Sequence, residues 1–275
     1  MAVGELGERM EALVGAIRAY GSTVVAYSGG VDSAVVAKAA YLALGEYAIA
    51  AISDSPTLPR SELEEASKTA ESIGIRFFAI ERSELDDPNF VENPLNRCYF
   101  CKKGLQEDLT TLARDIGAAT VTYGVNLDDL GEWRPGIQAA REGGARFPLV
   151  DVGFTKAEVR EVAQRWGLAV WDKPASPCLA SRIPYGERVT EEKLQLIERA
   201  EAFVRSMGFR DVRVRHLEGV ARVEVPLPDV ARLFAIEPFI VDHLRGLGFE
   251  SVALDPRGLR SGRLNEEAMV PGTSP

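Results

Sequence analysis

Short runs of apolar residues alternate with longer amphipathic segments through the first two-thirds of the chain. The apolar runs are nearly continuous, which is typical of strands buried on both faces, and the segments between them have apolar positions at helical spacing. This alternation predicts an α/β fold, a parallel sheet with helices on both faces. The predicted strands are 24–27, 47–52, 75–80 and 119–124, with weaker candidates at 147–150 and 169–171, and the predicted helices are 31–44, 60–73, 101–116 and 155–166.

Two of the predicted helices contain the residue pair of a capping box near their start. Ser61 is followed three residues later by Glu64, and Thr155 is followed by Glu158. In a capping box the hydroxyl and the carboxylate each accept a hydrogen bond from the other residue's backbone amide. Both helices are therefore expected to open with a capping box.

The pattern changes after Ser176. The segment 175–186 has prolines and a glycine at loop spacing and indicates a linker. Beyond it the sequence predicts a smaller α+β domain, with helices at about 190–207 and 228–247 and strands at 211–216, 220–225 and 250–254. The predicted domains are therefore 1–180 and 187–265, and residues 266–275 are expected to form a frayed tail.

Composition and charge narrow the class of protein. The 275 residues suffice for two ordinary domains, and 46% hydrophobic against 27% charged residues excludes disorder for most of the chain. No apolar run reaches the roughly 18–20 residues that a membrane span needs, and the first residues do not resemble a secretory signal, so we expect a cytoplasmic protein. A net charge of −9 argues against a nucleic-acid surface.

The charge is unevenly distributed along the chain. The segment from Glu187 to Asn265 is balanced in charge, and its cations are almost all arginines. Planar guanidinium groups match the oxygens of a phosphate, so this segment could hold a phosphate-bearing ligand. Arginines exposed on helices are the alternative interpretation.

The strongest chemical signal is the hexapeptide Ser28-Gly29-Gly30-Val31-Asp32-Ser33 between the first strand and the first long helix. Consecutive glycines let the backbone approach a phosphate, and the amides that follow lie at a helix N-terminus, which favours anions. Asp32 would be repelled by a bare phosphate, which suggests a Mg²⁺ ion between them. The Gly-Lys-Ser/Thr of a Walker loop is missing.

This hexapeptide resembles the pyrophosphate loop of the ATP pyrophosphatases, which cleave ATP between its α and β phosphates. The resemblance implies a Rossmann-like adenine nucleotide α-hydrolase domain and an adenylated reaction intermediate. It also implies that ATP binds at the carboxyl ends of the strands, where such folds hold their ligands, and that Asp32 binds Mg²⁺. The residues implied to contact ATP are Ala26, Ser28, Gly29, Gly30, Asp32, Ser33, Asp54, Gly124, Asn126 and Asp129.

Four further segments narrow the resemblance to one family. The segments 54–59, 96–103, 124–136 and 176–183 are similar to the LarE family, ATP-dependent sulfur transferases that make the organic part of the nickel-pincer cofactor of lactate racemase. The resemblance implies that pyridinium-3,5-biscarboxylic acid mononucleotide is the substrate and that its carboxylates are adenylated and then converted to thiocarboxylates. It further implies a sulfide source and other enzymes of cofactor biosynthesis as partners, and a homo-oligomer, a hexamer in this family.

The three cysteines decide between two sulfur sources within that family. In one kind of LarE protein a single cysteine gives up its own sulfur and becomes dehydroalanine, and in the other three cysteines hold a [4Fe–4S] cluster. Cys98, Cys101 and Cys178 match the second kind. Three thiolates leave one iron open, which could bind the sulfide that is transferred. Cys178 as a sacrificial donor, a zinc site and a redox pair stay open as alternatives.

The resemblance also implies contacts to the body of the substrate. Tyr99 would stack on the pyridinium ring, Lys103 would reach a phosphate and Arg134 would hold a carboxylate, while Arg182 follows Cys178 in the same loop. Core packing of the tyrosine and solvation of the lysine are the alternatives.

Three arginines of the second domain are implied to form a pocket for the nucleotide phosphate. Arg213 and Arg215 are two residues apart on a predicted strand and share a face, and Arg260 follows the last strand. Glu201 and Glu224 are expected to be ordinary surface carboxylates, with an acidic site at a subunit contact as the alternative.

Three other functions use the same loop. A tRNA thiolase would need a basic groove, which the net charge disfavours. An amide synthetase would need an ammonia source, and no glutaminase portion fits beside the two domains. A non-catalytic nucleotide sensor would make no use of the cysteines.

Overall fold

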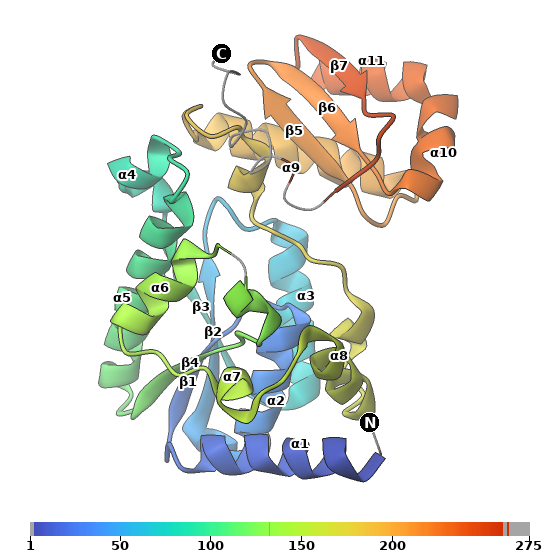
Figure 1. The fold of residues 1–275 in the computed structure, drawn as a ribbon. Helices are drawn as coiled ribbons and strands as arrows, with labels where there is room; N and C mark the ends of the chain where they lie inside the picture. Colours follow the sequence, from blue (N-terminus) through green and yellow to red (C-terminus); the bar gives the residue numbers. More distant parts are fainter. Residues whose placement is uncertain (1–2, 132, 261–262, 264–275) are drawn as a thin grey trace. The chain divides into compact units, whose positions relative to one another are not determined.

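A computed structural model describes residues 3–131, 133–260 and 263, and the predicted tail at 266–275 lies outside this range. The chain divides into two compact units (Figure 1). One contains the described residues of Met1–Arg82 and Cys98–Ser176, and the other contains those of Ser83–Arg97 and Pro177–Pro275. The sequence did not indicate that Ser83–Arg97 leaves the first unit, because nothing in its composition separates it from the predicted first domain.

The first unit is built on a four-stranded parallel sheet. Its strand order is β3-β2-β1-β4, and Val25 of the central strand lies opposite Ala50 on one side and Thr122 on the other. The four confidently predicted strands are confirmed as β1 (Thr23–Ala26), β2 (Ala48–Asp54), β3 (Arg76–Glu81) and β4 (Thr120–Tyr123).

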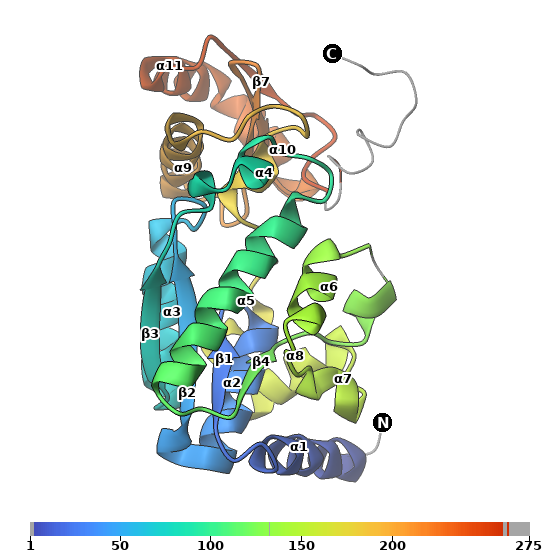
Figure 2. The ribbon, with the colours of Figure 1, turned by 90° about the vertical axis from the view of Figure 1, so that its left-hand side faces the viewer.

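Helices cover both faces of this sheet, as predicted. Val25 and Tyr27 point into one apolar core and Val24 and Ala26 point into the other, as the two-residue period of a strand requires. Figure 2 shows α5 crossing the sheet on the second face. The first face is covered by α1 (Val3–Arg18), α2 (Val31–Leu44), α3 (Arg60–Ile73), α7 (Pro148–Val152) and α8 (Lys156–Arg165), and the second by α5 (Arg97–Asp115) and α6 (Pro135–Glu142).

The two weaker strand predictions are wrong. The segment 147–150 forms the start of α7, because Pro148 has no amide for a strand ladder and suits the first position of a helix. Only Arg146 pairs with the sheet, as a single bridge to Thr122. The segment 169–171 is a 3₁₀ turn, Ala169–Asp172. The helices α1 and α6 were not predicted.

One capping box is confirmed and the other is not. The Thr155 hydroxyl accepts from the Glu158 amide, and the Glu158 carboxylate accepts from the Thr155 amide. Helix α3 begins at Arg60, one residue before Ser61, because Pro59 occupies the capping position with a φ of −55° that suits a helix start.

The second unit contains a three-stranded sheet of order β5-β6-β7, antiparallel in the first pair and parallel in the second. Glu218 and Gly219 both have positive φ, as a tight type I′ turn requires. The predicted helix 228–247 is two helices, since a break at Ile236 precedes Pro238. The elements are α4 (Pro88–Val91), α9 (Glu191–Ser206), β5 (Arg213–Leu217), β6 (Val220–Glu224), α10 (Val230–Ala235), α11 (Glu237–Leu247) and β7 (Ser251–Leu254).

The two faces of this sheet differ completely in polarity. Val214 and Val223 point into an apolar core with Val204 of α9 and Leu244 of α11. The opposite face presents arginines and carboxylates, which are described below. Within the described part of the chain, no helix is long and apolar enough to cross a membrane.

Candidate functional site

The loop Ser28–Ser33 connects β1 to α2 and is held by its own serines. The Ser28 and Ser33 hydroxyls lie 3.1 Å apart, the Ser33 Oγ accepts from the Ser28 amide, and it donates to the Gly30 carbonyl at 3.0 Å. Gly30 precedes the first residue of α2 and no side chain caps the helix. The amides of the first helical turn are therefore available to an anion.

At Gly29 and Gly124, the loop packs so closely against neighbouring backbone that a side chain would not fit. Gly29 has a φ of 70°, and a Cβ there would lie 2.8 Å from the Cβ of Ala66 on α3. A Cβ on Gly124, which ends β4, would lie 2.5 Å from the Ser33 backbone nitrogen. Side chains at either position would therefore displace the loop, which places Gly124 at the loop as the sequence predicted it to be.

Asp32 is fixed by residues from two distant segments. Its Oδ1 accepts from Asn126 Nδ2 at 3.0 Å, and its Oδ2 pairs with the Lys156 ammonium at the start of α8. The Asn126 side chain is buried, whereas the Asp32 carboxylate is about one-fifth exposed. A partly accessible carboxylate beside a phosphate-type loop is a suitable oxygen ligand for Mg²⁺.

Asn126 also organises the turn that follows β4. Its Oδ1 accepts from the amides of Asp128 and Asp129, and the Asp129 carboxylate accepts from the Asn126 amide at 3.1 Å. Asp129 in turn pairs with Arg134 at 2.9 Å. Burial raises the pKa of Asp129 above its ordinary value, opposed by the hydrogen bond from Asn126 and by Arg134. The structure thus gathers Asp32, Asn126, Asp129 and Arg134 in one connected set.

Lys156 is the residue of this set that the sequence analysis missed. Its backbone amide donates to Asp128 Oδ2 at 2.8 Å, so both its main chain and its side chain join α8 to the loop edge. The capping box at Thr155 and Glu158 located the start of α8 correctly, and Lys156 is the first residue of that helix. The sequence signal that could have identified Lys156 is its place as a basic residue at the start of a predicted helix.

Asp54 lies at the end of β2, next to β1, where the sequence placed it. Its carboxylate lies 2.5 Å from Arg60 Nη1, and Arg60 also donates to the carbonyls of Ser55 and Leu58. The arginine therefore fixes the Asp54 side chain and the turn that leads into α3.

Cys98 and Cys101 lie in the first turns of α5, three residues apart and therefore on one side of the helix. Between them, Tyr99 donates to Glu142 of α6 at 2.7 Å, and this hydrogen bond raises the pKa of the half-buried Tyr99 phenol. The hydrogen bond from Tyr99 lowers the pKa of the Glu142 carboxyl, and the positive charge of Lys103 lowers it further. The ammonium of Lys102 lies over the Tyr123 ring, 5.4 Å from its centre.

Cys178 belongs to the second unit, in a loop fixed by a buried arginine. Arg182 Nη1 donates to the carbonyls of Pro177 and Cys178, and its Nε and Nη2 donate to the two oxygens of Glu201 at 2.8 and 3.1 Å. Glu201 is fully buried, which corrects the expectation of a surface carboxylate. The contacts of Arg182 are those of a residue that shapes the Cys178 loop.

The same loop is held from the other side by the segment Ser83–Arg97. Asn93 is fully buried with a φ of 54°, and its Nδ2 donates to the carbonyls of Pro184 and Glu187. Arg97 donates to the Ala180 carbonyl at 2.9 Å and to the Asn93 side chain. These contacts explain why the segment belongs to the second unit.

The polar face of the second sheet is an arginine face, made of Arg213, Arg215, Arg222 and Arg263 with Glu224 and Asp255. Arg215 donates to Glu224 Oε2 at 3.0 Å, and Arg222 and Arg263 share Glu224 Oε1. Glu224 is fully buried, so the expectation of a surface carboxylate is wrong here too. The four guanidinium groups of this set outnumber its two carboxylates, and Asp211 and Glu201 also act electrostatically on Arg213.

Arg213 is the cation of this face that lacks a partner. Only 6% of its surface is exposed, and its guanidinium makes no hydrogen bond or ion pair with the described residues. Burial lowers the pKa of Arg213, and the neighbouring charges of Arg182 and Arg215 lower it further. A buried unpaired guanidinium is costly unless an anion satisfies it. Arg260, the third predicted phosphate ligand, is exposed beyond β7.

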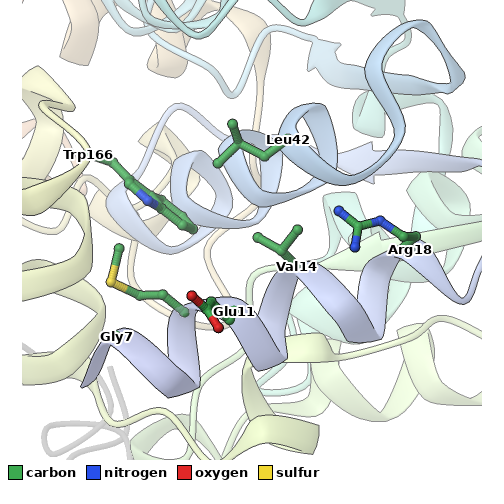
Figure 3. A pocket seen from close by; sticks show the side chains of 7 residues that line it. Gly7, Glu11, Val14, Arg18, Leu42 and Trp166 are labelled. Atoms are coloured by element: carbon green, nitrogen blue, oxygen red, sulfur yellow. The ribbon is translucent and has the colours of Figure 1, made fainter. Parts of the chain in front are cut away.

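A separate groove of about 540 Å³ lies on the surface of the first unit, between α1, the end of α2 and the end of α8 (Figure 3). Trp166, Leu42 and Val14 form its apolar part, and Glu11 and Arg18 lie along α1. None of the predicted site residues lines it. The described residues also contain no group of three cysteine, histidine or carboxylate side chains arranged to hold a metal ion.

Comparison with known proteins identifies the family. A model of the NAD synthase family matches residues 6–89, which include the loop and Asp54. The chain is 34% identical to pyridinium-3,5-bisthiocarboxylic acid mononucleotide synthase of Lactiplantibacillus plantarum over 95% of both chains. It is 47% identical to an uncharacterized protein of Synechocystis, over 88% of this chain and 91% of that protein. A GMP synthase of Aeropyrum pernix is 32% identical, over 74% of this chain and 42% of that enzyme.

A relative that is 34% identical along nearly the whole of both sequences defines the family. The chain belongs to the LarE family of ATP-dependent sulfur transferases.

Proposed function

We propose that this protein uses ATP to convert the carboxylates of pyridinium-3,5-biscarboxylic acid mononucleotide into thiocarboxylates. The observation that supports this most directly is the fixed Asp32–Lys156 pair at an uncapped helix start, in a chain of this family. An anion-binding loop with one carboxylate and one ammonium has the groups that a Mg²⁺-bound triphosphate requires.

Activation precedes sulfur transfer because a carboxylate is a poor electrophile. A substrate carboxylate oxygen attacks the α-phosphorus of ATP, the bond to the β-phosphate oxygen breaks, and pyrophosphate leaves. The amides at the start of α2 and the Lys156 ammonium stabilise the charge on the departing pyrophosphate. Asp32 is the residue that would hold Mg²⁺, which supplies further charge neutralisation when bound.

Sulfur then replaces AMP at the activated carbon. A sulfide sulfur attacks the acyl carbon, and the bond to the AMP oxygen breaks, which leaves a thiocarboxylate and free AMP. The second carboxylate reacts in the same way. Each thiocarboxylate therefore consumes one ATP and releases one pyrophosphate and one AMP.

The arginine face suits the monophosphate of the substrate. Its arginines outnumber its carboxylates, which favours a phosphate, and the Arg213 guanidinium makes no hydrogen bond to the described residues. We assign the substrate phosphate to Arg213, Arg215 and Arg260. Arg182, whose donors bind Glu201 and the loop carbonyls, shapes the Cys178 loop and contacts the substrate only through it.

The sulfur source is the finer part of the proposal. Cys98 and Cys101 fit as two thiolate ligands of a [4Fe–4S] cluster because both lie on one side of α5. Cys178, which is in no disulfide, is proposed as the third. Such a cluster would supply one open iron for an exogenous sulfide. Cys178 as a sacrificial donor is the competing source.

The test combines turnover with mass spectrometry. The purified protein is reconstituted anaerobically with iron and sulfide and then supplied with ATP, Mg²⁺ and the pyridinium dicarboxylate mononucleotide. We expect AMP, pyrophosphate and the thiocarboxylate, and iron bound by wild type but lost in Cys98→Ala and Cys178→Ala. Absence of any thiocarboxylate would contradict the proposed function. Thiocarboxylate formation without iron, with Cys178 converted to dehydroalanine, would assign the sulfur to Cys178.

A further inference from the structure

Asp255 and Arg263, which lie on either side of Arg260 in the sequence, form a buried ion pair. Asp255 directly follows the strand and is 3% exposed, and Arg263 is 1% exposed. Arg263 Nη1 lies 2.5 Å from Asp255 Oδ2 and 3.0 Å from Glu224 Oε1. The exposed Arg260 lies between these two residues in the sequence. The pair therefore flanks an arginine to which we assign the substrate phosphate.

Asp255 also shapes the turn that leads to Arg260. Its Oδ1 accepts from the Arg257 amide at 2.8 Å, and its own amide donates to the Val223 carbonyl at 2.9 Å. Two residues of the turn are fixed against the end of β6. The Leu259 amide donates to the Val225 carbonyl at 2.7 Å, and Gly258 has a φ of 73°, with Leu227 backbone atoms 3.1 Å from where a Cβ would be.

The Asp255–Arg263 pair is connected to the other residues of the arginine face through Glu224. Glu224 accepts from Arg263 on one oxygen and from Arg215 on the other, so the Asp255–Arg263 pair and Arg215 share one buried carboxylate. Two nitrogens of Arg263, Nε and Nη2, have no hydrogen-bond partner among the described residues. Buried unpaired donors cost stability, and buried ion pairs contribute little net stability but strongly restrict geometry. An arrangement of this kind favours a role in positioning.

We propose that Asp255 and Arg263 form a clamp that positions Arg260 so that its guanidinium joins Arg213 and Arg215 at one phosphate. This inference rests on the proposed function, because it takes the mononucleotide phosphate as the ligand of the arginine face. The clamp residues touch no substrate and act mainly through Arg260, while Arg263 also shares Glu224 with Arg215. Asp255 and Arg263 are therefore positioning residues, and most of their effect must disappear when the Arg260 side chain is removed.

A double-mutant cycle tests this dependence. Asp255→Asn removes the charge and keeps the size of the side chain, and Arg263→Lys keeps the charge and loses the planar fork. We expect each to raise the KM for the mononucleotide about tenfold and to change kcat and the KM for ATP less than about twofold. In an Arg260→Ala background each substitution should raise the KM much less, and what is left is the part transmitted to Arg215 through Glu224. Arg205→Ala is the matched control, because Arg205 pairs with the buried Glu201 from outside the arginine face.

The outcomes separate the two proposals. If Arg260→Ala leaves the KM for the mononucleotide unchanged, the assignment of the phosphate is wrong and the clamp is wrong with it. If Arg260→Ala raises the KM but the clamp substitutions raise it equally in both backgrounds, only the clamp is overturned. Circular dichroism and thermal unfolding are measured for every variant. If Asp255→Asn fails to fold, the Arg263→Lys cycle alone decides by the same criterion.

Discussion

The Lys156 ammonium of α8 is paired with the Asp32 carboxylate of α2, and Asn126 holds the other oxygen of the same carboxylate. The nucleotide loop is thus fixed from outside by two residues that follow it far along the chain. Without a nucleotide, the ammonium neutralises the one carboxylate of the loop. In the proposed reaction, the same ammonium lies beside the phosphates of ATP.

Replacing Lys156 is expected to impair turnover far more than folding. Lys156→Ala removes a cation from the site of pyrophosphate departure, and we expect kcat/KM for ATP to fall about 10²- to 10³-fold. Release of AMP and pyrophosphate measures this. The control is Lys68→Ala, at an exposed position of α3, which should match wild type. Equal losses in both variants would argue against a role for Lys156 at the phosphates.

A methyl group at Gly124 is expected to displace the loop. In Gly124→Ala the new Cβ would meet the Ser33 nitrogen at 2.5 Å, where backbone atoms border it on the loop side. We expect a loss of about 1–3 kcal/mol in the free energy of unfolding and a higher KM for ATP. Urea unfolding and ATP titration measure the two effects. Gly15→Ala, on α1 with no neighbouring atom within 4 Å, should show neither.

Removal of the Arg213 side chain should weaken binding of the mononucleotide without lowering the free energy of unfolding. Arg213→Ala is expected to raise the KM for the mononucleotide by about 10- to 100-fold, the loss of one or two charge-assisted hydrogen bonds. The free energy of unfolding should change little or increase, since no protein contact is lost. Arg182→Ala gives the contrast, because breaking its buried pair with Glu201 should cost about 3–5 kcal/mol. A large loss of stability in Arg213→Ala would show that the residue is structural.

The carboxyl of Asp129 should give a distinctive dependence of stability on pH. Burial raises its pKa in the folded protein, so between the unfolded and folded pKa values the folded state binds more protons. Its contribution to stability therefore declines as the pH rises through that range. Relative to wild type, Asp129→Asn should gain stability as the pH is raised from about 4 towards neutrality. Urea unfolding at a series of pH values, without nucleotide or Mg²⁺, measures the difference; a gain on acidification instead would contradict the assignment.

The first unit was largely predictable because its strands are buried on both faces. Runs such as 47–52 have no polar positions to obscure the pattern, and the glycines of the hexapeptide mark the turn that must follow β1. The predictions failed where proline decides local structure. Pro148 turned an apolar run into a helix, and Pro59, not Ser61, precedes the first residue of α3, whose predicted range 60–73 is confirmed.

The partners of the site residues were much harder to predict than the residues themselves. Asp32 was identified from its own neighbours in sequence, but Lys156 is brought to it only by the packing of α8 on α2. Glu201 and Glu224 look like surface carboxylates in sequence because their arginine partners lie on other elements. Burial of a charge depends on long-range pairing, which no local pattern contains.

The division of the second unit between two stretches of chain has a consequence for how the protein is made. Ser83–Arg97 leaves the ribosome before the whole of Cys98–Ser176, yet Asn93 donates to the carbonyls of Pro184 and Glu187, and Arg97 donates to that of Ala180 as well as to Asn93. During synthesis, the polar side chains of this stretch therefore lack these hydrogen-bond partners until the later segment has left the ribosome. The sheet of the first unit, by contrast, is complete once β4 has been made. A fragment that starts at Pro177 would therefore lack part of its own interior, and expression of the second unit alone requires residues 83–97 to be supplied with it.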